Sequence, residues 1–237
     1  MVSHHDKDPH TVHSYDDELD QIQATIRRMG AMTAEQVAMT VRAFQMGDEK
    51  RARTVIDVDK TVDALESEIN ELIVQLLAKR APVAIDLREI ISSLKIAGFL
   101  ERIGDYAKNC AKRVRALDNG DSVSPVRHTL VKVGSQAEVL IREVMDAHTH
   151  RDALKALAVW EADAELDALH AQTHQLILTE MRKDPELVHD YAHLLFFSKN
   201  LERIGDHCTN IAEEVHFFIT GHEPEEDRPK ADDSADQ

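Results

Sequence analysis

The stretch LERIGD at positions 100–105 recurs without a change at positions 201–206. Six identical consecutive residues are far beyond chance, and self-similarity at a fixed distance indicates an internal duplication. The likeness continues beyond the motif, through the paired residues Asn109 and Asn210, Ala111 and Ala212, and Val114 and Val215. The chain therefore consists of two copies of one unit.

A second pair of matched segments lies upstream of each LERIGD. The segment DKTVD at 59–63 corresponds to DAELD at 163–167, at nearly the same distance from its own motif. Each copy is long enough for three helices, and antiparallel helices with short connections form up-down-up bundles. We expect the two copies to join near residues 118–124.

The composition favours long helices. Aromatic residues make up 4% of the chain, with only 8 Gly and 6 Pro, so strand formers and turn formers are scarce. Capping residues, glycines and prolines divide the chain into six predicted helical stretches. The predicted boundaries are a cap at Ser14, a stop and cap at Gly47-Asp48, a break at Ala81-Pro82, a third helix from Pro82 to Leu117, a start at Ser124-Pro125, a boundary at His148 to Arg151, and a last helix from Asp184-Pro185-Glu186 to Thr220 before Gly221.

The predicted fold is all-α, with two tandem, pseudo-symmetric three-helix bundles. The first bundle spans residues 14–119 and the second spans residues 124–220. A flexible N-terminus, residues 1–13, and a disordered acidic tail, residues 221–237, flank them. The tail has no apolar periodicity, which is typical of disorder.

The charge balance excludes one class of partner. The chain has 44 acidic and 28 basic residues, a net charge of −16, whereas nucleic-acid binding requires lysine and arginine to neutralise phosphates. Two cysteines, no signal segment and no apolar run of about 18 residues predict a cytoplasmic protein that does not span a membrane. We expect both thiols, Cys110 and Cys208, to be buried on apolar seams.

The matched segments carry four pairs of acidic residues, each with a spacing of four. On a helix, such a pair lies about 40° apart and projects from one face. If the second and third helices of a copy pack antiparallel, their carboxylates converge in a groove on the outside of the bundle. The pairs are Asp59 with Asp63, Glu101 with Asp105, Asp163 with Asp167, and Glu202 with Asp206.

Clustered carboxylates repel one another, so a cation is expected among them. One reading is a metal ion bound by hard oxygen ligands, which His170 and His174 would extend. The other reading is neutralisation by the nearby bases Arg102, Lys108 and Lys112.

Two further features of the motif carry structural predictions. Gly104 and Gly205 lie inside helical patterns and predict close approach of a neighbouring helix, or room for a cluster. Arg102 and Arg203 are expected to pair with Asp105 and Asp206 at a spacing of three.

ERIGD followed by asparagine, twice, each copy preceded by a helix with DxxxD, resembles the PhoU family of phosphate-transport and phosphate-signalling regulators. The resemblance covers about residues 14–220, including YDDEL at 15–19 and DLR at 86–88. It implies two symmetry-related three-helix bundles and multinuclear clusters of iron or zinc, with other divalent cations as an alternative. The implied metal ligands are Asp59, Asp63, Glu101, Asp105, Asp163, Asp167, Glu202 and Asp206. DLR has no counterpart in the second copy, so the two sites need not bind the same metal or partner.

The resemblance also implies a function. The resemblance implies a cytoplasmic negative regulator that links the ATPase subunit of the phosphate ABC transporter to the phosphate-sensing histidine kinase and restrains the phosphate-starvation response. Such a protein reaches the membrane only through its partners, and we expect a homodimer.

Two alternatives remain open at this point. A ferritin-like di-metal oxidase would use Glu-x-x-His pairs in a helical core, and two such pairs exist, Glu186 with His189 and Glu213 with His216. They are not duplicated and lie on one predicted helix, which favours coincidence. A helical interaction protein without metal is the other alternative. With no nucleophile beside a base and no phosphate-binding glycine loop, we expect no enzyme activity.

Overall fold

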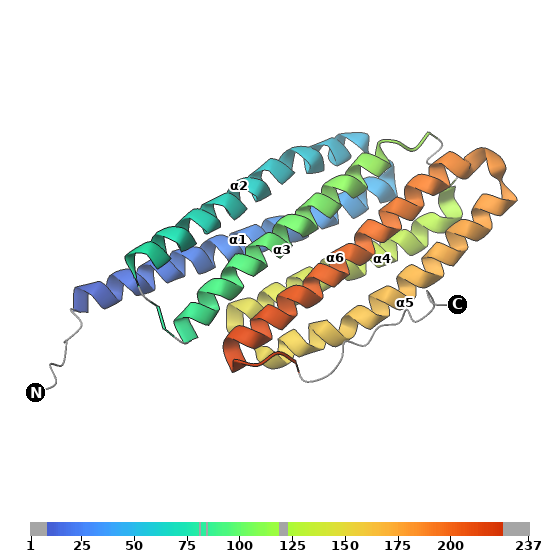
Figure 1. Cartoon of the computed structure of the whole chain (residues 1–237). Coiled ribbons are helices and arrows are strands. Elements are labelled where there is room, and N and C mark those ends of the chain that lie inside the picture. Colours follow the sequence, from blue (N-terminus) through green and yellow to red (C-terminus); the bar gives the residue numbers. More distant parts are fainter. Residues whose placement is uncertain (1–8, 81, 84, 119–122, 225–237) are drawn as a thin grey trace, which may run out of the picture.

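The computed structural model describes residues 9–80, 82–83, 85–118 and 123–224. The predicted all-α fold with six long helices is confirmed (Figure 1). The elements are α1 (Pro9–Met46), α2 (Glu49–Lys79), α3 (Ile85–Val114), α4 (Ser124–His150), α5 (Ala153–Lys183), a 3-10 turn η2 (Pro185–Leu187) and α6 (Val188–Thr220).

Local capping residues set several helix ends. The side chains of Asp48 and Asp152 each accept a hydrogen bond from the backbone N–H three residues on, at 3.0 Å, and so cap α2 and α5. Gly47 and Gly221 have positive φ angles of 63° and 85°, the backbone conformation that ends a helix and favours glycine. The predicted stops at both glycines are confirmed.

Several predicted boundaries differ. Helix α3 runs from Ile85 to Val114, and not from Pro82 to Leu117. Helix α1 begins at Pro9 rather than at Ser14, because proline is well suited to the first helical position. Val123 occupies the cap position of α4, and Ser124 is already helical. Asp184 accepts a hydrogen bond from the N–H of Glu186 at 3.1 Å, but it opens η2 and not α6 itself. Residues 1–8 of the predicted N-terminus, 119–122 of the junction and 225–237 of the tail lie outside the described residues.

The helices pack as two bundles that share one interior. α1, α2 and α3 contact one another, as do α4, α5 and α6, and the bundles meet through α1 against α4 and α3 against α6. α2 and α5 lie on opposite outer sides of the molecule (Figure 1). Buried apolar side chains from both bundles form a single core cluster, in which Phe44 and Phe197 contact each other across the interface at 4.6 Å between ring centroids.

Contacts between α3 and α6 follow a pseudo-twofold axis. Glu214 of α6 accepts hydrogen bonds from Ser92 at 2.9 Å and Lys95 at 2.7 Å on α3. At the other end of the interface Arg113, the repeat counterpart of Glu214, contacts the counterparts of these two residues. Its guanidinium lies 3.3 Å from His193 Nδ1 and 4.7 Å from the ring centroid of Phe196.

The axis itself passes close to Tyr106 and His207. These residues occupy the same position in the two repeats, and their rings stack at 5.6 Å with an interplanar angle of 20°. The end of α6 contacts the start of α3 through Glu214 and Ser92, and the end of α3 contacts the start of α6 through Arg113 and His193, so the two helices run antiparallel. The ERIGD segments therefore lie near the centre of the molecule.

The contacts between helices α1 and α4 obey the same pseudo-twofold symmetry. A Cβ atom on Gly30 would lie 2.7 Å from Met145 Cε, and one on Gly134 would meet the side chain of Val41. The two contacts are counterparts in the two repeats, and in both the missing side chain lets the helices approach.

No helix in the described part of the chain combines the length and the apolar character needed to cross a bilayer.

Candidate metal-binding clusters

The predicted carboxylates lie on the outer helix pair of each bundle. We call Asp59, Asp63, Glu101 and Asp105, on α2 and α3, the first cluster, and Asp163, Asp167, Glu202 and Asp206, on α5 and α6, the second cluster. The sequence placed all eight in outer grooves. Asp59 and Asp163 are instead buried, 2% and 1% exposed, whereas the other six residues are half-buried or exposed. Each cluster thus extends from the interior to the surface.

The two motif glycines explain this burial. A Cβ atom on Gly104 would lie 3.3 Å from Val62 Cγ1 and 3.5 Å from Asp59 Oδ1. On Gly205 it would collide with Asp163 Oδ1 and the side chain of Leu166. The predicted close approach at both glycines is confirmed, and in each bundle it leaves room for one aspartate between the two helices.

The carboxylates of the first cluster repel one another. Burial and the charge of Asp59 raise the pKa of Asp63, with a further contribution from Asp105. Burial and the charge of Asp105 raise the pKa of Glu101, and Asp63 adds to this effect. Glu66, one turn beyond Asp63, raises both pKa values. The first cluster is therefore a concentrated negative field shared by α2 and α3.

Lys108 lies inside this field. Its Nζ is 2.5 Å from Asp59 Oδ2 and 2.5 Å from Asp105 Oδ1, so one ammonium joins α2 to α3. Burial opposes the charged form of Lys108, but hydrogen bonds to Asp105 and Asp59 outweigh burial and hold its pKa above the ordinary value. The other oxygen of Asp59 accepts a hydrogen bond from Gln36 Nε2 at 3.2 Å.

The other two predicted bases act differently. Lys112 donates a hydrogen bond to Asn109 at 3.4 Å. Arg102 Nε lies 3.8 Å from Glu101, so the predicted pairing of Arg102 with Asp105 is wrong. Asp105 is paired with Lys108, three residues on, because Lys108 projects towards α2 while the Arg102 side chain is 63% exposed to solvent.

The second cluster has different neighbours. Thr209 stands at the position of Lys108, is fully buried, and donates its hydroxyl to the backbone carbonyl of Asp206 at 2.7 Å. Lys199 pairs with Glu202 at 2.7 Å at the exposed rim. His170 replaces Glu66, and its Nδ1 lies 2.9 Å from the hydroxyl of Ser198.

The donor types of the second cluster suit the metals that the sequence resemblance implies, although no three of its described residues have ligand atoms that all lie within 4.8 Å of one another. Carboxylate oxygens together with an imidazole nitrogen are ligands that suit zinc and iron. The ring of His174 lies 6.2 Å from that of His170, one turn further along α5. The first cluster offers oxygen donors only, and an ammonium already lies between its two helices.

A third group of ligand-type side chains lies elsewhere. Among the described residues, Asp118, His189 and Asp190 form the one group of three whose ligand atoms all lie within 4.8 Å of one another. Asp190 is buried and accepts a hydrogen bond from the N–H of Asp118 at 2.9 Å. Sequence reasoning missed this group because its members are far apart in the chain and are not repeated.

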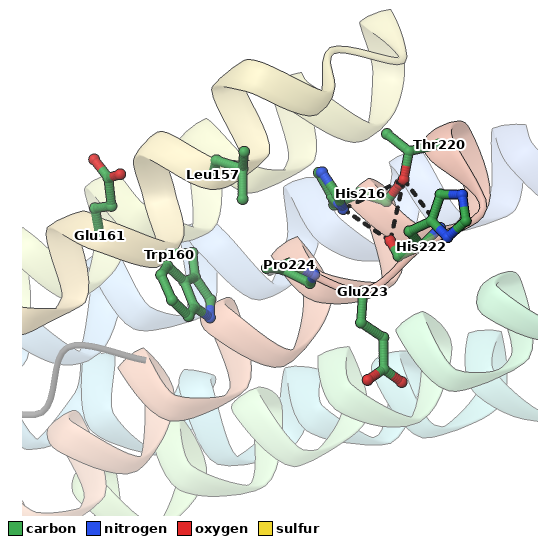
Figure 2. Close-up of a pocket in the computed structure, with 8 residues that line it drawn as sticks. All are labelled: Leu157, Trp160, Glu161, His216, Thr220, His222, Glu223 and Pro224. Carbon is green, nitrogen blue, oxygen red and sulfur yellow. Dashed lines mark hydrogen bonds between the residues drawn. The ribbon is translucent and has the colours of Figure 1, made fainter. Parts of the chain in front are cut away.

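The Glu-x-x-His pairs do not form a di-metal site. Glu186 and His189 lie at the start of the last helical segment, and Glu213 and His216 lie near the end of α6. Glu213 accepts a hydrogen bond from Trp160 Nε1 at 3.0 Å. His216 lines a surface pocket, where its Nδ1 lies 3.0 Å from the carbonyl oxygen of His222 (Figure 2). The pairs are thus coincidences of a histidine-rich chain.

This pocket lies between the start of α5 and the end of α6. Figure 2 shows Trp160 facing it from one side and the C-terminal end of α6 from the other. Its lining residues are Leu157, Trp160, Glu161, His216, Thr220, His222, Glu223 and Pro224. None of the repeated carboxylates contributes to it.

Together, the fold and the clusters define a class of protein: an all-helical tandem repeat with an acidic cluster on each of its two bundles. Sequence comparison gives the family within that class. The PhoU domain matches residues 26–114 and 130–215, so each repeat is one such domain. The chain belongs to the PhoU family.

Curated relatives and solved structures agree with this assignment. The chain is 41% identical to the phosphate-specific transport system accessory protein PhoU homolog of Caulobacter vibrioides (strain NA1000 / CB15N), over 94% of this chain and 97% of that protein. It is 42% identical to the homolog of Zymomonas mobilis, over 93% of each. The crystal structure of PhoU from Pseudomonas aeruginosa superposes with a TM-score of 0.83 at 33% identity, covering 88% of this chain and 100% of that one.

Proposed function

We propose that this chain is a non-enzymatic accessory protein of phosphate transport that restrains phosphate uptake and the phosphate-starvation (Pho) regulon. The observation that carries the proposal is the 41% identity, over 94% of the chain, to a phosphate-specific transport system accessory protein. A solved structure with a TM-score of 0.82, covering 89% of this chain, is titled a phosphate transport system regulatory protein, from Streptococcus pneumoniae. The PhoU domain matches both repeats, at residues 26–114 and 130–215, which supports a role for each of them.

The proposed mode of action is that of a cytoplasmic adaptor. One surface binds the ATPase subunit of the phosphate ABC transporter, another binds the phosphate-sensing histidine kinase, and the adaptor reaches the membrane through these partners alone. The pseudo-symmetry supports this arrangement, because two similar bundles with different exposed residues can present two related surfaces. In this proposal the adaptor is a homodimer, which light scattering of the purified chain tests.

The proposed metal centre uses the repeated carboxylates as ligands for a multinuclear iron or zinc cluster. Support comes from the donor chemistry described above and from the burial of one aspartate per cluster beside a glycine. When bound, such a cluster supplies positive charge that neutralises the acidic surface and holds the two helices together. The eight repeated residues supply the oxygen donors through their carboxylates.

A gene deletion tests the regulatory role. In phosphate-rich medium, the deletion strain should express a Pho-regulated reporter that the parent keeps off, and the wild-type gene should restore repression. Repression that persists in the deletion strain would contradict the proposal.

Affinity capture tests the adaptor role. Tagged full-length protein, added to detergent-solubilised membranes, should retain the cognate histidine kinase and the phosphate-transporter ATPase, but not an unrelated ABC ATPase. Empty capture with folded protein would count against the adaptor.

A further inference from the structure

Lys108 occupies a position that a bridging cation would take. It joins one carboxylate from each helix of the pair, Asp59 on α2 and Asp105 on α3, both at 2.5 Å. A metal ion shared by these two carboxylates would have to displace the ammonium or lie beside it. Since Asp59 is only 2% exposed, solvent screens this pair poorly, and repulsion between the ammonium and an incoming cation is strong.

The second repeat lacks this lysine at the same place. Thr209 is uncharged, is too short to reach across to α5, and uses its hydroxyl on a backbone carbonyl. Lys199 neutralises Glu202 from the rim, but it is 52% exposed and pairs within its own helix. Exposed pairs of this kind contribute little and are easily exchanged.

The two clusters nevertheless carry the same formal charge. The first, counted with Glu66 and Lys108, has five carboxylates and one ammonium. The second, counted with His170 and Thr209, has four carboxylates and an imidazole that the formal count takes as uncharged. Relative to the first cluster, the second therefore has one ammonium and one carboxylate fewer and has an imidazole nitrogen in addition. The formal charge of the two clusters is the same.

We propose that Lys108 is the resident cation of the first cluster, so that the metal centre of the wild-type chain forms at the second cluster and not at the first. This inference rests on the metal-binding part of the proposed function. Lys108 acts as a specificity residue, because it decides which of two similar acidic clusters accepts a metal ion.

The decisive variant is Lys108→Thr, which places in the first repeat the residue found in the second. Full-length protein is stripped with a chelator, loaded with Zn²⁺ and freed of unbound metal, and the zinc content per chain is measured by mass spectrometry. Wild-type zinc should be lost in Asp206→Ala and kept in Asp105→Ala. Lys108→Thr should bind additional zinc, and Asp105→Ala in that background should remove the addition. Lys112→Thr, which removes a lysine from the same helix outside the cluster, is the matched control and should behave as wild type.

Thermal unfolding gives a second readout. Without metal, Lys108→Thr should melt below wild type, because Asp59 loses its ammonium partner, and zinc should raise its melting temperature more than that of wild type. We expect the apparent zinc affinity of the first cluster to rise by at least about tenfold in this variant, since a charge within about 4 Å is removed from the site.

Two results would overturn the inference. If Asp105→Ala removes as much zinc from the wild-type chain as Asp206→Ala does, both clusters bind metal despite Lys108. If folded Lys108→Thr gains no zinc, the lysine does not control the site. Absence of zinc from every folded variant would refute this inference and the metal centre together, whereas normal Pho repression in the same strains would leave the regulatory role intact.

Discussion

Glu101 and Asp63 are ionised next to other carboxylates, so their charges oppose folding of the metal-free protein. Burial and neighbouring carboxylates raise both pKa values. An acid whose folded pKa is raised binds protons more readily in the folded state, so stability falls as pH rises from the ordinary carboxyl pKa through the folded pKa. At neutral pH the full penalty is present, and in acid it disappears.

Glu101→Gln should therefore stabilise the metal-free chain at pH 7. We expect the melting temperature to rise by about 1–2 °C, because relief of like-charge repulsion at a partly exposed site is worth about 0.5 kcal/mol in a chain of this size. The gain should shrink as the pH falls and vanish at about pH 3, where Glu101 is protonated in both states. Glu68→Gln, on the exposed face of α2, is the control and should show no such gain. Equal melting temperatures for Glu101→Gln and wild type at pH 7 would contradict the repulsion.

His148 gives a pH dependence of the opposite sign. It is 3% exposed, and burial, with help from Arg27 and Arg151, lowers its pKa to about 4. Between about pH 6.5 and 4 the unfolded chain binds a proton that the folded chain does not, so stability falls as pH falls through this window.

His148→Phe should reduce that slope. The replacement keeps an aromatic ring beside Phe218, whose centroid lies 6.0 Å away, and it removes the proton. Urea unfolding at pH 5 and pH 7 should show a smaller stability difference than in wild type, by up to about 1.4 kcal/mol per pH unit. His128→Gln, at an exposed position, should keep the wild-type slope. The same slope in all three proteins would exclude His148 as its source.

The crossing of α5 and α6 depends on the missing side chain of Gly205. A methyl group there collides with Asp163 and Leu166, both from α5. Gly98, on α3, is the matched case, because a methyl group there would meet nothing within 4 Å.

The two alanine substitutions should shift stability in opposite directions. We expect Gly205→Ala to cost about 1–3 kcal/mol by overpacking, and Gly98→Ala to gain up to about 1 kcal/mol from better helix propensity. The urea midpoint of each variant measures the effect. A stabilised Gly205→Ala would show that the helices separate at no cost.

Helix ends and helix neighbours differ in how far the sequence predicts them. Gly47 and Gly221 were identified as stops because a helix end is set by the residues at that end. The start of α1 at Pro9 was missed because several residues there can open a helix. The crossings of α1 with α4 and of α3 with α6 were not predicted, since apolar faces do not specify which face they meet.

The candidate clusters, too, were predicted only in part from the sequence. Duplication identified the eight carboxylates and both glycines, because repeated positions stand out from chance acidic pairs. The burial of Asp59 and Asp163 was missed, since a helical wheel treats each helix alone and ignores the space left by a glycine on its neighbour. Lys108 was one of three candidate bases, and only the packing of α2 on α3 distinguishes it from Arg102 and Lys112.

The continuous core makes the chain one cooperative unit. Apolar side chains from both repeats form a single buried cluster, so neither repeat keeps its interior if the other unfolds. The single tryptophan, Trp160, lies in the second repeat, and far-UV circular dichroism reports on both repeats.

Tryptophan fluorescence and circular dichroism should therefore give superimposable urea unfolding curves for the metal-free chain. Coincidence of two probes is the standard sign of two-state unfolding. A fluorescence transition separated from the circular dichroism transition would mean that the repeats unfold independently.

The stacked pair of Tyr106 and His207 shows what fusing the two halves into one chain allows. In a dimer of identical subunits, a residue on the twofold axis meets its own copy, so any substitution changes both sides at once. A single chain is free of this constraint, and here a phenol faces an imidazole. The same freedom lets one acidic cluster have a lysine and the other a threonine, so covalent linkage turns two copies of one binding site into two sites that can diverge in chemistry.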